Sequence, residues 1–302
     1  MGEDTTKGLR KKALRLLDRY RVTEGKGFRL KRIDPADTAG LDFDKAEARS
    51  LLAEGTERLA ALQERLYADD RYAILLIFQA MDAAGKDSTI KHVMSGVNPQ
   101  GCQVTSFKHP SAEALDHDFL HRHQAALPER GRIGIHNRSW YEEVLVVRVH
   151  PEILAAQKLP APLVTKRIWT ERLADIAAYE RYLARQGTVI LKFFLHVSKE
   201  EQKRRFLERI DRPEKNWKFS MGDIRERGFW DDYQAAYEEA IRATAAPHAP
   251  WFVVPADNKW FTRLVVCAAV VTALEDLDLR FPEVTEAMKA ELEAARTALL
   301  AE

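Results

Sequence analysis

The sequence predicts an α/β protein with a parallel sheet, and three observations support this class. Five apolar runs of strand length occur between residues 72 and 256, and continuous apolar runs are typical of strands covered on both faces. Segments with apolar residues at helical spacing separate these runs, as expected when helices connect parallel strands. Apolar residues make up 46% of the 302-residue chain, which is enough for a sizeable core.

The elements can be placed in order along the chain. An arm of residues 1–43, with some helix, precedes a helix from Asp44 to about Tyr67. Five strands are then expected at residues 72–78, 102–107, 132–136, 188–197 and 251–256. Further helices are expected at residues 86–95, 111–127 and 164–187, after Ser198, from Lys259 and after Pro282. Ser111 and Ser198 stand at N-cap positions, and Gly187 ends the long helix.

Charge and cysteine content narrow the functional classes. The net charge is +1, but basic side chains cluster in residues 1–32 and 199–218. Such clusters in a nearly neutral chain favour a polyanion bound at one site over general coating of DNA, although each cluster alone also fits a solvated helix face. No apolar run reaches the roughly 18 residues that predict a membrane span. Cys102 and Cys267 lie in apolar stretches, which favours reduced thiols and a cytoplasmic protein.

The stretch AILLIFQAMDAAGKDSTIKHV, residues 73–93, has the strand, turn and helix order of a phosphate-binding P-loop. It departs from the Walker A pattern G-x-x-x-x-G-K-[ST] twice, because Ala80 replaces the first glycine and Asp87 replaces the Ser or Thr. Gly85 remains where the backbone must approach a phosphate, and Lys86 remains where an ammonium group would reach it. The alternative is an ordinary strand-to-helix turn with an exposed lysine.

A carboxylate inside this loop, Asp82, suggests a metal ion. Negative charge beside phosphates is favourable when Mg²⁺ lies between them. Asp82 could instead simply form the turn, a role that suits Asp. Ligands of parallel sheets gather at the carboxyl ends of the strands, so we expect the polar residues that follow the other strands to lie near this loop. These residues are Lys108, Asn137 and Arg138.

The third predicted strand ends in the string HNRSWYEEV, which offers a second set of polar groups. Asn137 carries a carbonyl oxygen at the place where a metal-binding acid is usual. Arg138 can hold a phosphoryl group with its planar guanidinium and stabilise charge on it. Glu142 follows one turn later, where it could also serve merely as an acid that stabilises the first turn of a helix.

A basic segment follows the fourth predicted strand, and it includes Arg204, Arg205, Arg209 and Lys215. An arginine-rich helix at this position resembles the lid of small nucleoside kinases, which closes over phosphates and supplies cations. Trp217 and Phe219 within the segment could instead indicate a surface for nucleic acid. We favour the lid, because the basic run is short and acids are interleaved with it.

Long strings of the chain resemble the polyphosphate kinase-2 family. They are FQAMDAAGKDSTIKHVMSGVNPQGCQVTSFK, ALPERGRIGIHNRSWYEEVLVVRVHPE and SKEEQKRRFLERIDRPEKNWKFSMGDIRERGFWDDYQAAYEEAI, with GKGFRL before them and APWFVVPADNKWFTRL after them. The resemblance runs from about Tyr20 to about Glu275. It implies one P-loop kinase domain related to thymidylate kinases, with three α/β/α layers and a five-stranded parallel sheet. Residues 44–200 and 246–302 would then form the core and residues 201–245 a helical lid.

The resemblance also implies roles for individual residues. Asp82 and Lys86 match the metal-binding acid and the phosphate-binding lysine, and Arg138 matches the arginine of the second motif; we expect these three to be catalytic. Asn137 and Glu142 are expected to share the metal ion and, with Arg122, to bind the nucleotide. The remaining phosphate or polyphosphate contacts are expected from Ala83, Ala84, Gly85, Asp87, Ser88, Lys108, Arg204, Arg205, Arg209 and Lys215.

Two positions carry further information within the resemblance. Asn137 followed by RSWYEEV resembles the class that phosphorylates nucleoside monophosphates as well as diphosphates. His136 stands where the family usually has Phe, a change that concerns the packing behind Asn137.

The implied activity is Mg²⁺-dependent transfer of a phosphoryl group from inorganic polyphosphate to AMP or ADP, or to GMP or GDP, with Mn²⁺ as an alternative ion. The products would be nucleoside di- and triphosphates. The resemblance further implies a homo-oligomer, a dimer or tetramer, and we expect no nucleic-acid or membrane partner. Two alternatives remain open: an ATP-dependent nucleoside monophosphate kinase on the same fold, and a non-catalytic polyanion-binding protein.

Overall fold

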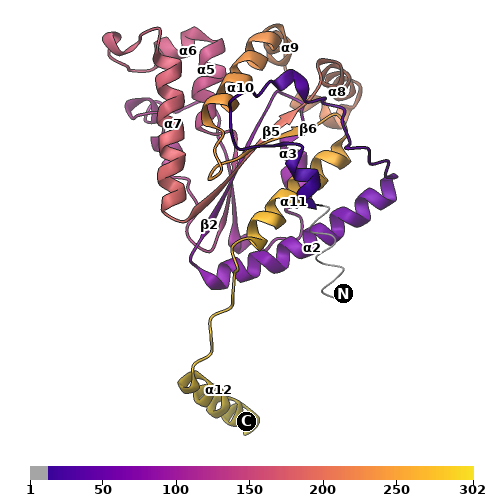
Figure 1. Ribbon diagram of the computed structural model, residues 1–302, viewed down its shortest axis with the longest axis vertical. Helices are drawn as coiled ribbons and strands as arrows, with labels where there is room; N and C mark the ends of the chain where they lie inside the picture. The colour runs from indigo at the N-terminus through magenta and orange to yellow at the C-terminus, as the bar shows by residue number, and fades with distance from the viewer. Residues whose placement is uncertain (1–12) are drawn as a thin grey trace.

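The computed structural model describes residues 13–302, so the first twelve residues of the predicted arm and of its basic cluster lie outside it. A six-stranded sheet with the order β1-β6-β5-β2-β4-β3 forms the middle layer. Helices α2, α3 and α11 pack together as one outer layer, and α7 and α10 as the other (Figure 1). The predicted α/β class, with helices on both faces of a mostly parallel sheet, is confirmed.

Five of the strands are the predicted ones, and all five are parallel to their neighbours among them. They are β2 (Ala73–Ala80), β3 (Cys102–Ser106), β4 (Ile133–Asn137), β5 (Thr188–His196) and β6 (Trp251–Pro255). The predicted number of five strands was wrong, because the arm adds β1 (Arg21–Val22) antiparallel to β6. A strand of two residues has no alternation of apolar and polar side chains from which it could be predicted.

The long helices lie where the apolar spacing predicts them. They are α2 (Lys45–Asp69), α3 (Lys86–Val93), α7 (Ile168–Arg185), α8 (Lys199–Asp211), α11 (Lys259–Glu275) and α12 (Glu286–Leu300). One further long helix, α10 (Trp230–Thr244), was not predicted. Ser198 caps α8 as predicted, because its hydroxyl accepts the Glu201 amide at 3.0 Å. Gly187 takes a φ of +85° just beyond α7, the left-handed conformation that glycine tolerates best.

The predicted helix over residues 111–127 was wrong. The segment forms only two short turns, η3 (Ala114–Asp116) and α4 (His121–Gln124). Between them, the Asp118 carboxylate accepts the Leu120 amide at 2.9 Å, a local hydrogen bond that competes with a continuous helix. The Ser111 hydroxyl accepts the Ala114 amide at 3.1 Å and so caps the first turn alone.

Several short elements were not predicted, and some of them surround the carboxyl ends of the strands. The segment after β4 folds into η4 (Trp140–Val144), α5 (Val146–Val149) and α6 (Pro151–Ala156). The segment between α8 and α10 contains η6 (Pro213–Lys218) and α9 (Met221–Gly228). The other short turns are η1 (Leu30–Arg32), η2 (Pro99–Gly101) and η5 (Ala161–Leu163).

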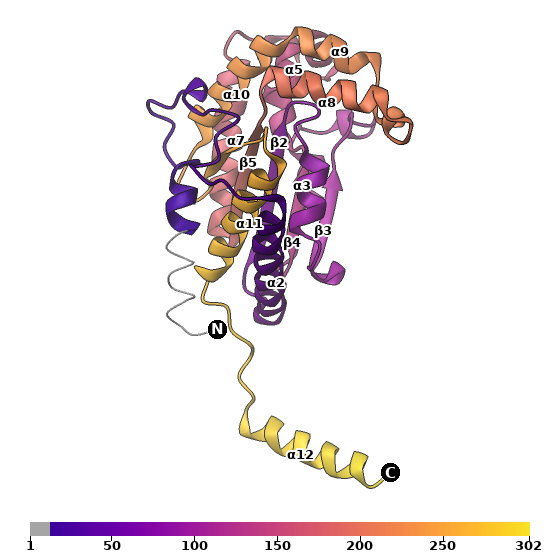
Figure 2. The same cartoon turned by 90° about the vertical axis from the view of Figure 1, so that its right-hand side faces the viewer.

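The C-terminal segment differs from the rest of the chain in its exposure. Every residue from 282 to 302 is exposed, and α12 extends away from the body (Figure 2). Among residues 13–302, no helix combines the length and apolar character needed to cross a membrane. Both cysteines are free, and burial raises the pKa of Cys102 to about 11 and that of Cys267 to about 12.

Candidate active site

The loop between β2 and α3 has the backbone geometry of an anion-binding turn. Ala83 and Gly85 take positive φ values of +61° and +108°, which turn the chain sharply into α3. The first amide groups of α3 have no partner inside the helix and carry partial positive charge, so they suit a phosphate oxygen. Ala80 lies within β2 in extended conformation, which explains why no glycine is needed there.

Lys86 opens α3 and bends back over this loop. Its ammonium group donates to the Ala80 carbonyl at 3.0 Å. Burial lowers the pKa of Lys86, and the nearby Arg138 lowers it further, while the charges of Asp82 and Glu142 act in the opposite direction. The lysine therefore lies among the charged groups of the loop.

Arg138 follows β4 in a strained conformation, with a φ of +66°. Its amide donates to the Phe78 carbonyl of β2 at 3.0 Å, which ties the turn to the neighbouring strand. Its guanidinium lies between two carboxylates, 3.6 Å from Asp82 and 3.7 Å from Glu142. The charge of Glu142 is the main cause that raises the pKa of Arg138. The three residues expected to be catalytic thus meet at one edge of the sheet.

A cavity of about 580 Å³ opens beside Asp82, Arg138 and Glu142. Its walls come from elements that the sequence did not predict, α5, α6 and α9, together with α8 and α10. The polar and aromatic wall residues that sequence reasoning missed are His109, His150, Glu152, Gln202, Ser220, Asp223, Arg225, Glu226, Phe229, Tyr233 and Tyr237. Most of them lie in the long strings that carry the family resemblance, beyond the basic residues considered there.

Asp223 of α9 faces the loop across this cavity. Burial raises the pKa of Asp223, and the charge of Asp82 raises it further. Arg209 of α8 lies 3.8 Å from the Asp223 carboxylate. Of the lid cations expected to contact polyphosphate, Arg209 is thereby linked to a residue of the cavity wall.

Arg205 is bound within the protein. Its guanidinium donates to the carbonyls of Ala83 at 3.0 Å and Ala84 at 2.7 Å, in the phosphate-binding loop. It also donates to the carbonyls of Ala256 and Asp257 after β6, and to the carboxylate of Glu201. A guanidinium has five N–H donors, so these five bonds use all of them. Arg205 therefore supports the loop from behind.

The other two lid cations pair with carboxylates of α8. Arg204 donates twice to Glu201, at 2.6 Å each, and Lys215 donates to Glu208 at 2.6 Å. Neither residue lines the cavity beside Asp82. Both side chains retain contact with solvent, so a polyanion could displace these surface pairs.

The remaining expected contacts lie around the loop. The Asn137 amide group donates to the Asp87 carboxylate at 2.7 Å, and Arg263 donates to the Ser88 hydroxyl at 2.9 Å. Farther along the same edge, Arg122 donates to the Lys108 carbonyl at 2.7 Å and to the Glu143 carboxylate at 3.5 Å. The Lys108 side chain itself is exposed.

The residues expected to hold a metal ion differ in their surroundings. Asp82 is partly exposed at the cavity, whereas burial raises the pKa of Glu142 and Arg138 separates the two carboxylates. Within residues 13–302 no group of three or more His, Cys, Asp and Glu side chains could hold a metal ion. A single accessible carboxylate fits Mg²⁺, which commonly binds one or two carboxylates and completes its shell with phosphates and water.

Comparisons with known proteins show which proteins the chain resembles. The chain is 51% identical over 282 residues to an ADP-polyphosphate phosphotransferase of Rhodopseudomonas palustris, covering 93% of this chain and 97% of the relative. It is 46% identical over 267 residues to an AMP/ADP-polyphosphate phosphotransferase of Meiothermus ruber, covering 88% and 96%. A crystal structure of polyphosphate kinase 2 from Arthrobacter aurescens matches with a TM-score of 0.84 and 40% identity, covering 93% of this chain and 95% of that one.

The family model described as Polyphosphate kinase 2 (PPK2) matches residues 42–282. This match covers the phosphate-binding loop, the turn after β4 and the whole segment from α8 to α11. The chain belongs to the polyphosphate kinase 2 family.

Proposed function

We propose that the protein transfers the terminal phosphoryl group of inorganic polyphosphate to a purine nucleoside mono- or diphosphate. The observation that carries this proposal is the meeting of Asp82, Lys86 and Arg138 beside a phosphate-binding loop and an open cavity. Relatives named as phosphotransferases between polyphosphate and AMP, ADP or GDP support the same pair of substrates.

The chemistry requires little beyond positioning and charge. A terminal phosphate oxygen of the nucleotide attacks the last phosphorus of the polyphosphate chain, a new P–O bond forms, and the bridging P–O bond breaks. The nucleotide gains one phosphoryl group and the polyphosphate is left one unit shorter. The attacking oxygen is already anionic near pH 7, so no strong general base is needed.

The residues of the site divide these tasks. The loop amides, Lys86 and Arg138 hold the transferring phosphoryl group and stabilise its negative charge. A divalent cation held at Asp82, Mg²⁺ or Mn²⁺, would neutralise further charge between the phosphates. Glu142 orients Arg138, and Asn137 orients Asp87 at the start of α3. Arg204, Arg209 and Lys215 would exchange their carboxylate partners for polyphosphate.

The proposed substrates also bear on the compartment and the partners of the enzyme. Polyphosphate and nucleotides favour a cytoplasmic protein, and the free thiols fit a reducing compartment. We also propose a homo-oligomer, a dimer or tetramer, without nucleic-acid or membrane partners.

One assay tests the proposed reaction. Purified protein is incubated with AMP or ADP, Mg²⁺ and long-chain polyphosphate, and the products ADP and ATP are separated and quantified. We expect both nucleotides to be phosphorylated, and chelation of the metal to stop the reaction. Phosphorylation of AMP by ATP alone, with none from polyphosphate, would instead identify a nucleoside monophosphate kinase. Salt-sensitive binding of polyphosphate without any nucleotide product would identify a non-catalytic binder.

A further inference from the structure

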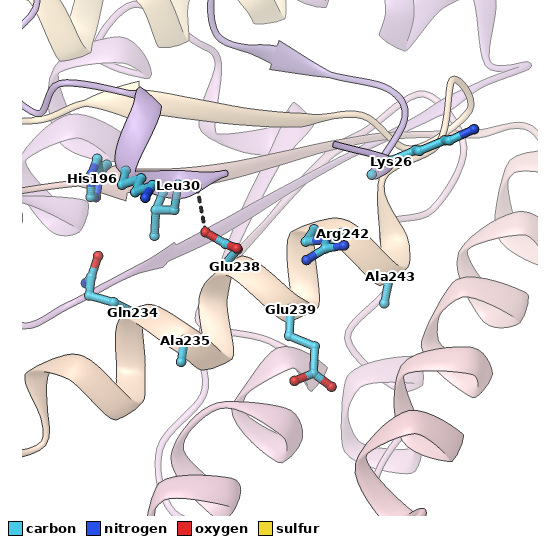
Figure 3. Close-up of a pocket in the computed structure, with 11 residues that line it drawn as sticks. Lys26, Leu30, His196, Gln234, Ala235, Glu238, Glu239, Arg242 and Ala243 are labelled. Atoms are coloured by element: carbon cyan, nitrogen blue, oxygen red, sulfur yellow. Dashed lines mark hydrogen bonds between the residues drawn. The ribbon is translucent and has the colours of Figure 1, made fainter. Parts of the chain in front are cut away.

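A second cavity, of about 840 Å³, lies between the N-terminal arm and α10 (Figure 3). Its volume falls in the range of about 300–1,000 Å³ that is usual for small-molecule sites. It is separate from the active-site cavity, because Tyr233 and Tyr237 of α10 line that one, whereas Gln234, Glu238 and Arg242 line this one. None of the residues assigned above to phosphoryl transfer contributes to it.

One end of this cavity carries unpaired positive charge. Arg242 of α10 and Lys26 of the arm line it, and neither forms an ion pair with a residue in the described part of the chain. The two acids in the lining are already engaged, Glu238 with Arg29 at 3.2 Å and Glu239 with Arg148 at 2.8 Å. The cavity therefore presents cations without an ion-pair partner, which suits a phosphate group.

The other end is apolar with two buried hydrogen-bonding groups. His196 is 93% buried at the end of β5, since its relative exposure is 7%, and its Nδ1 has no partner within residues 13–302. The Nε2 of Gln234 is likewise buried and unpaired. Leu30 and Ala235 line the cavity beside them (Figure 3). An apolar wall with adjacent unpaired polar groups suits a flat base, because the edge of a purine carries hydrogen-bond donors and acceptors next to one another.

A carboxylate lies between these two ends. Glu238 accepts the Leu30 amide at 2.8 Å, which fixes its position in the lining (Figure 3). Each carboxylate oxygen can accept more than one hydrogen bond, so Glu238 can also accept from ribose hydroxyl groups. Gln234, Glu238 and Arg242 recur every four residues on one side of α10, and the first and last are about 12 Å apart along the helix axis.

We propose that this cavity is a second, non-catalytic site for a purine nucleotide, with the base at His196 and Gln234, the ribose at Glu238 and the phosphates at Arg242 and Lys26. The order of these groups along α10 is the order of base, sugar and phosphate in a nucleotide. Because α10 also lines the active site, a nucleotide bound here contacts the same helix from its other side. The proposal does not depend on the phosphoryl transfer reaction, since binding alone tests it.

Equilibrium dialysis with labelled ADP, in the absence of polyphosphate, tests the number of sites. We expect two ADP molecules per chain for the wild-type protein and one for the Lys26→Ala/Arg242→Ala variant, which should still carry out phosphoryl transfer. The control Arg65→Ala removes an exposed arginine of α2 that lines neither cavity, and it should bind two. One ADP per chain in the wild type, or two in the double variant, would overturn the proposal.

Competition binding then distinguishes a nucleotide from a bare phosphate chain, because both would bind the same cations. In the Lys86→Ala variant, whose catalytic site is weakened, AMP should displace bound ADP far better than adenosine or pyrophosphate at equal concentration. Gln234→Leu should weaken ADP binding at this site by about tenfold, the loss of one buried hydrogen bond, and leave pyrophosphate binding unchanged. Equal displacement by pyrophosphate and AMP, with no effect of Gln234→Leu, would rule out a nucleotide site.

Discussion

Lys86 and Arg138 are two cations of the site, and the same two carboxylates, Asp82 and Glu142, lie near both of them. The charges of Asp82 and Glu142 favour the protonated form of Lys86, and the same two acids flank Arg138. Two like charges at such short range are costly unless an anion lies between them. The two cations are therefore placed to stabilise the negative charge of a transferring phosphoryl group.

Replacing Lys86 with Ala is expected to lower the rate of phosphoryl transfer by about 10³-fold or more, because one cation on the transferring group would be missing. The midpoint of thermal unfolding should stay near the wild-type value, since the only hydrogen bond that the side chain makes to a described residue is to the Ala80 carbonyl. Lys91→Ala, which removes an exposed lysine of the same helix, is the matched control. A Lys86→Ala variant with more than about a tenth of wild-type turnover would contradict this role.

His136 is expected to make the stability of the protein depend on pH. Its ring is fully buried between Phe107 and Trp140, and burial lowers its pKa to about 4 from the usual 6.5. The unfolded chain then binds a proton below pH 6.5 that the folded chain does not bind until pH 4. Stability from this group is complete above pH 6.5 and is lost as the pH falls toward 4.

His136→Phe should reduce this acid sensitivity. The wild-type contribution of this ring falls by about 2 kcal/mol between pH 7 and pH 5, and the variant has no proton to bind at that position. Urea unfolding at the two pH values measures the difference. The same loss of stability in both proteins would show that this histidine does not titrate as its burial implies. His92→Phe, at a half-buried position on α3, is the control.

At the scale of elements, α8 and the phosphate-binding loop form one unit through Arg205. The five bonds of this side chain join α8, the loop and the end of β6. Because the carbonyls of Ala83 and Ala84 bind the guanidinium, the loop amide groups can face a phosphate on the other side. The start of the predicted lid is thus fixed to the site, and any closing motion would involve residues that follow Arg205.

Arg205→Ala is expected to impair both stability and catalysis. Several buried carbonyls would lose their donor, so unfolding free energy should fall by at least about 3 kcal/mol. A displaced loop should lower kcat by about 10²-fold even well below the unfolding midpoint, with a smaller change in KM. Arg205→Lys, which keeps the charge but not the five donors, should be nearly as impaired.

The control for this variant is Arg212→Ala, an exposed arginine beyond the end of α8 whose one ion pair within residues 13–302 is with Glu208. It should leave stability and turnover close to wild type. If Arg205→Lys restored full activity, charge alone would account for the residue, and a role in positioning the loop would be excluded.

Particular elements show what the sequence could predict and what it could not. The rule that ligands gather at strand ends correctly brought Asp82 and Arg138 together, because both follow strands whose apolar runs are unmistakable. The use of all five Arg205 N–H groups in hydrogen bonds within the protein could not be predicted. These bonds depend on carbonyls of the loop and of the segment after β6, over 50 residues away in the sequence. The predicted helix over residues 111–127 is interrupted where the Asp118 side chain accepts a local hydrogen bond. Apolar spacing in the sequence does not show such a bond.

At the scale of the whole molecule, the chain consists of a packed body and a detached C-terminal segment. The family match ends at residue 282, and every residue beyond it is exposed, including Met288, Leu292 and Leu299 of α12. These three side chains lie on one stripe of the helix, because their spacings of four and seven residues keep them on the same side. No residue of α12 is buried, so we expect the helix to contribute little to the stability of the body.

Deleting residues 283–302 should therefore leave the thermal unfolding midpoint and the turnover per chain unchanged. The active-site cavity contains no residue beyond Tyr237, and the packed layer of α2, α3 and α11 ends before the deletion. Calorimetry and the polyphosphate assay measure the two quantities, and light scattering on the same samples measures the mass of the assembly. A midpoint lowered by more than about 3 °C, roughly 1 kcal/mol, would mean that α12 packs on the body. A smaller mass at unchanged midpoint and turnover would assign the exposed stripe to contacts between chains.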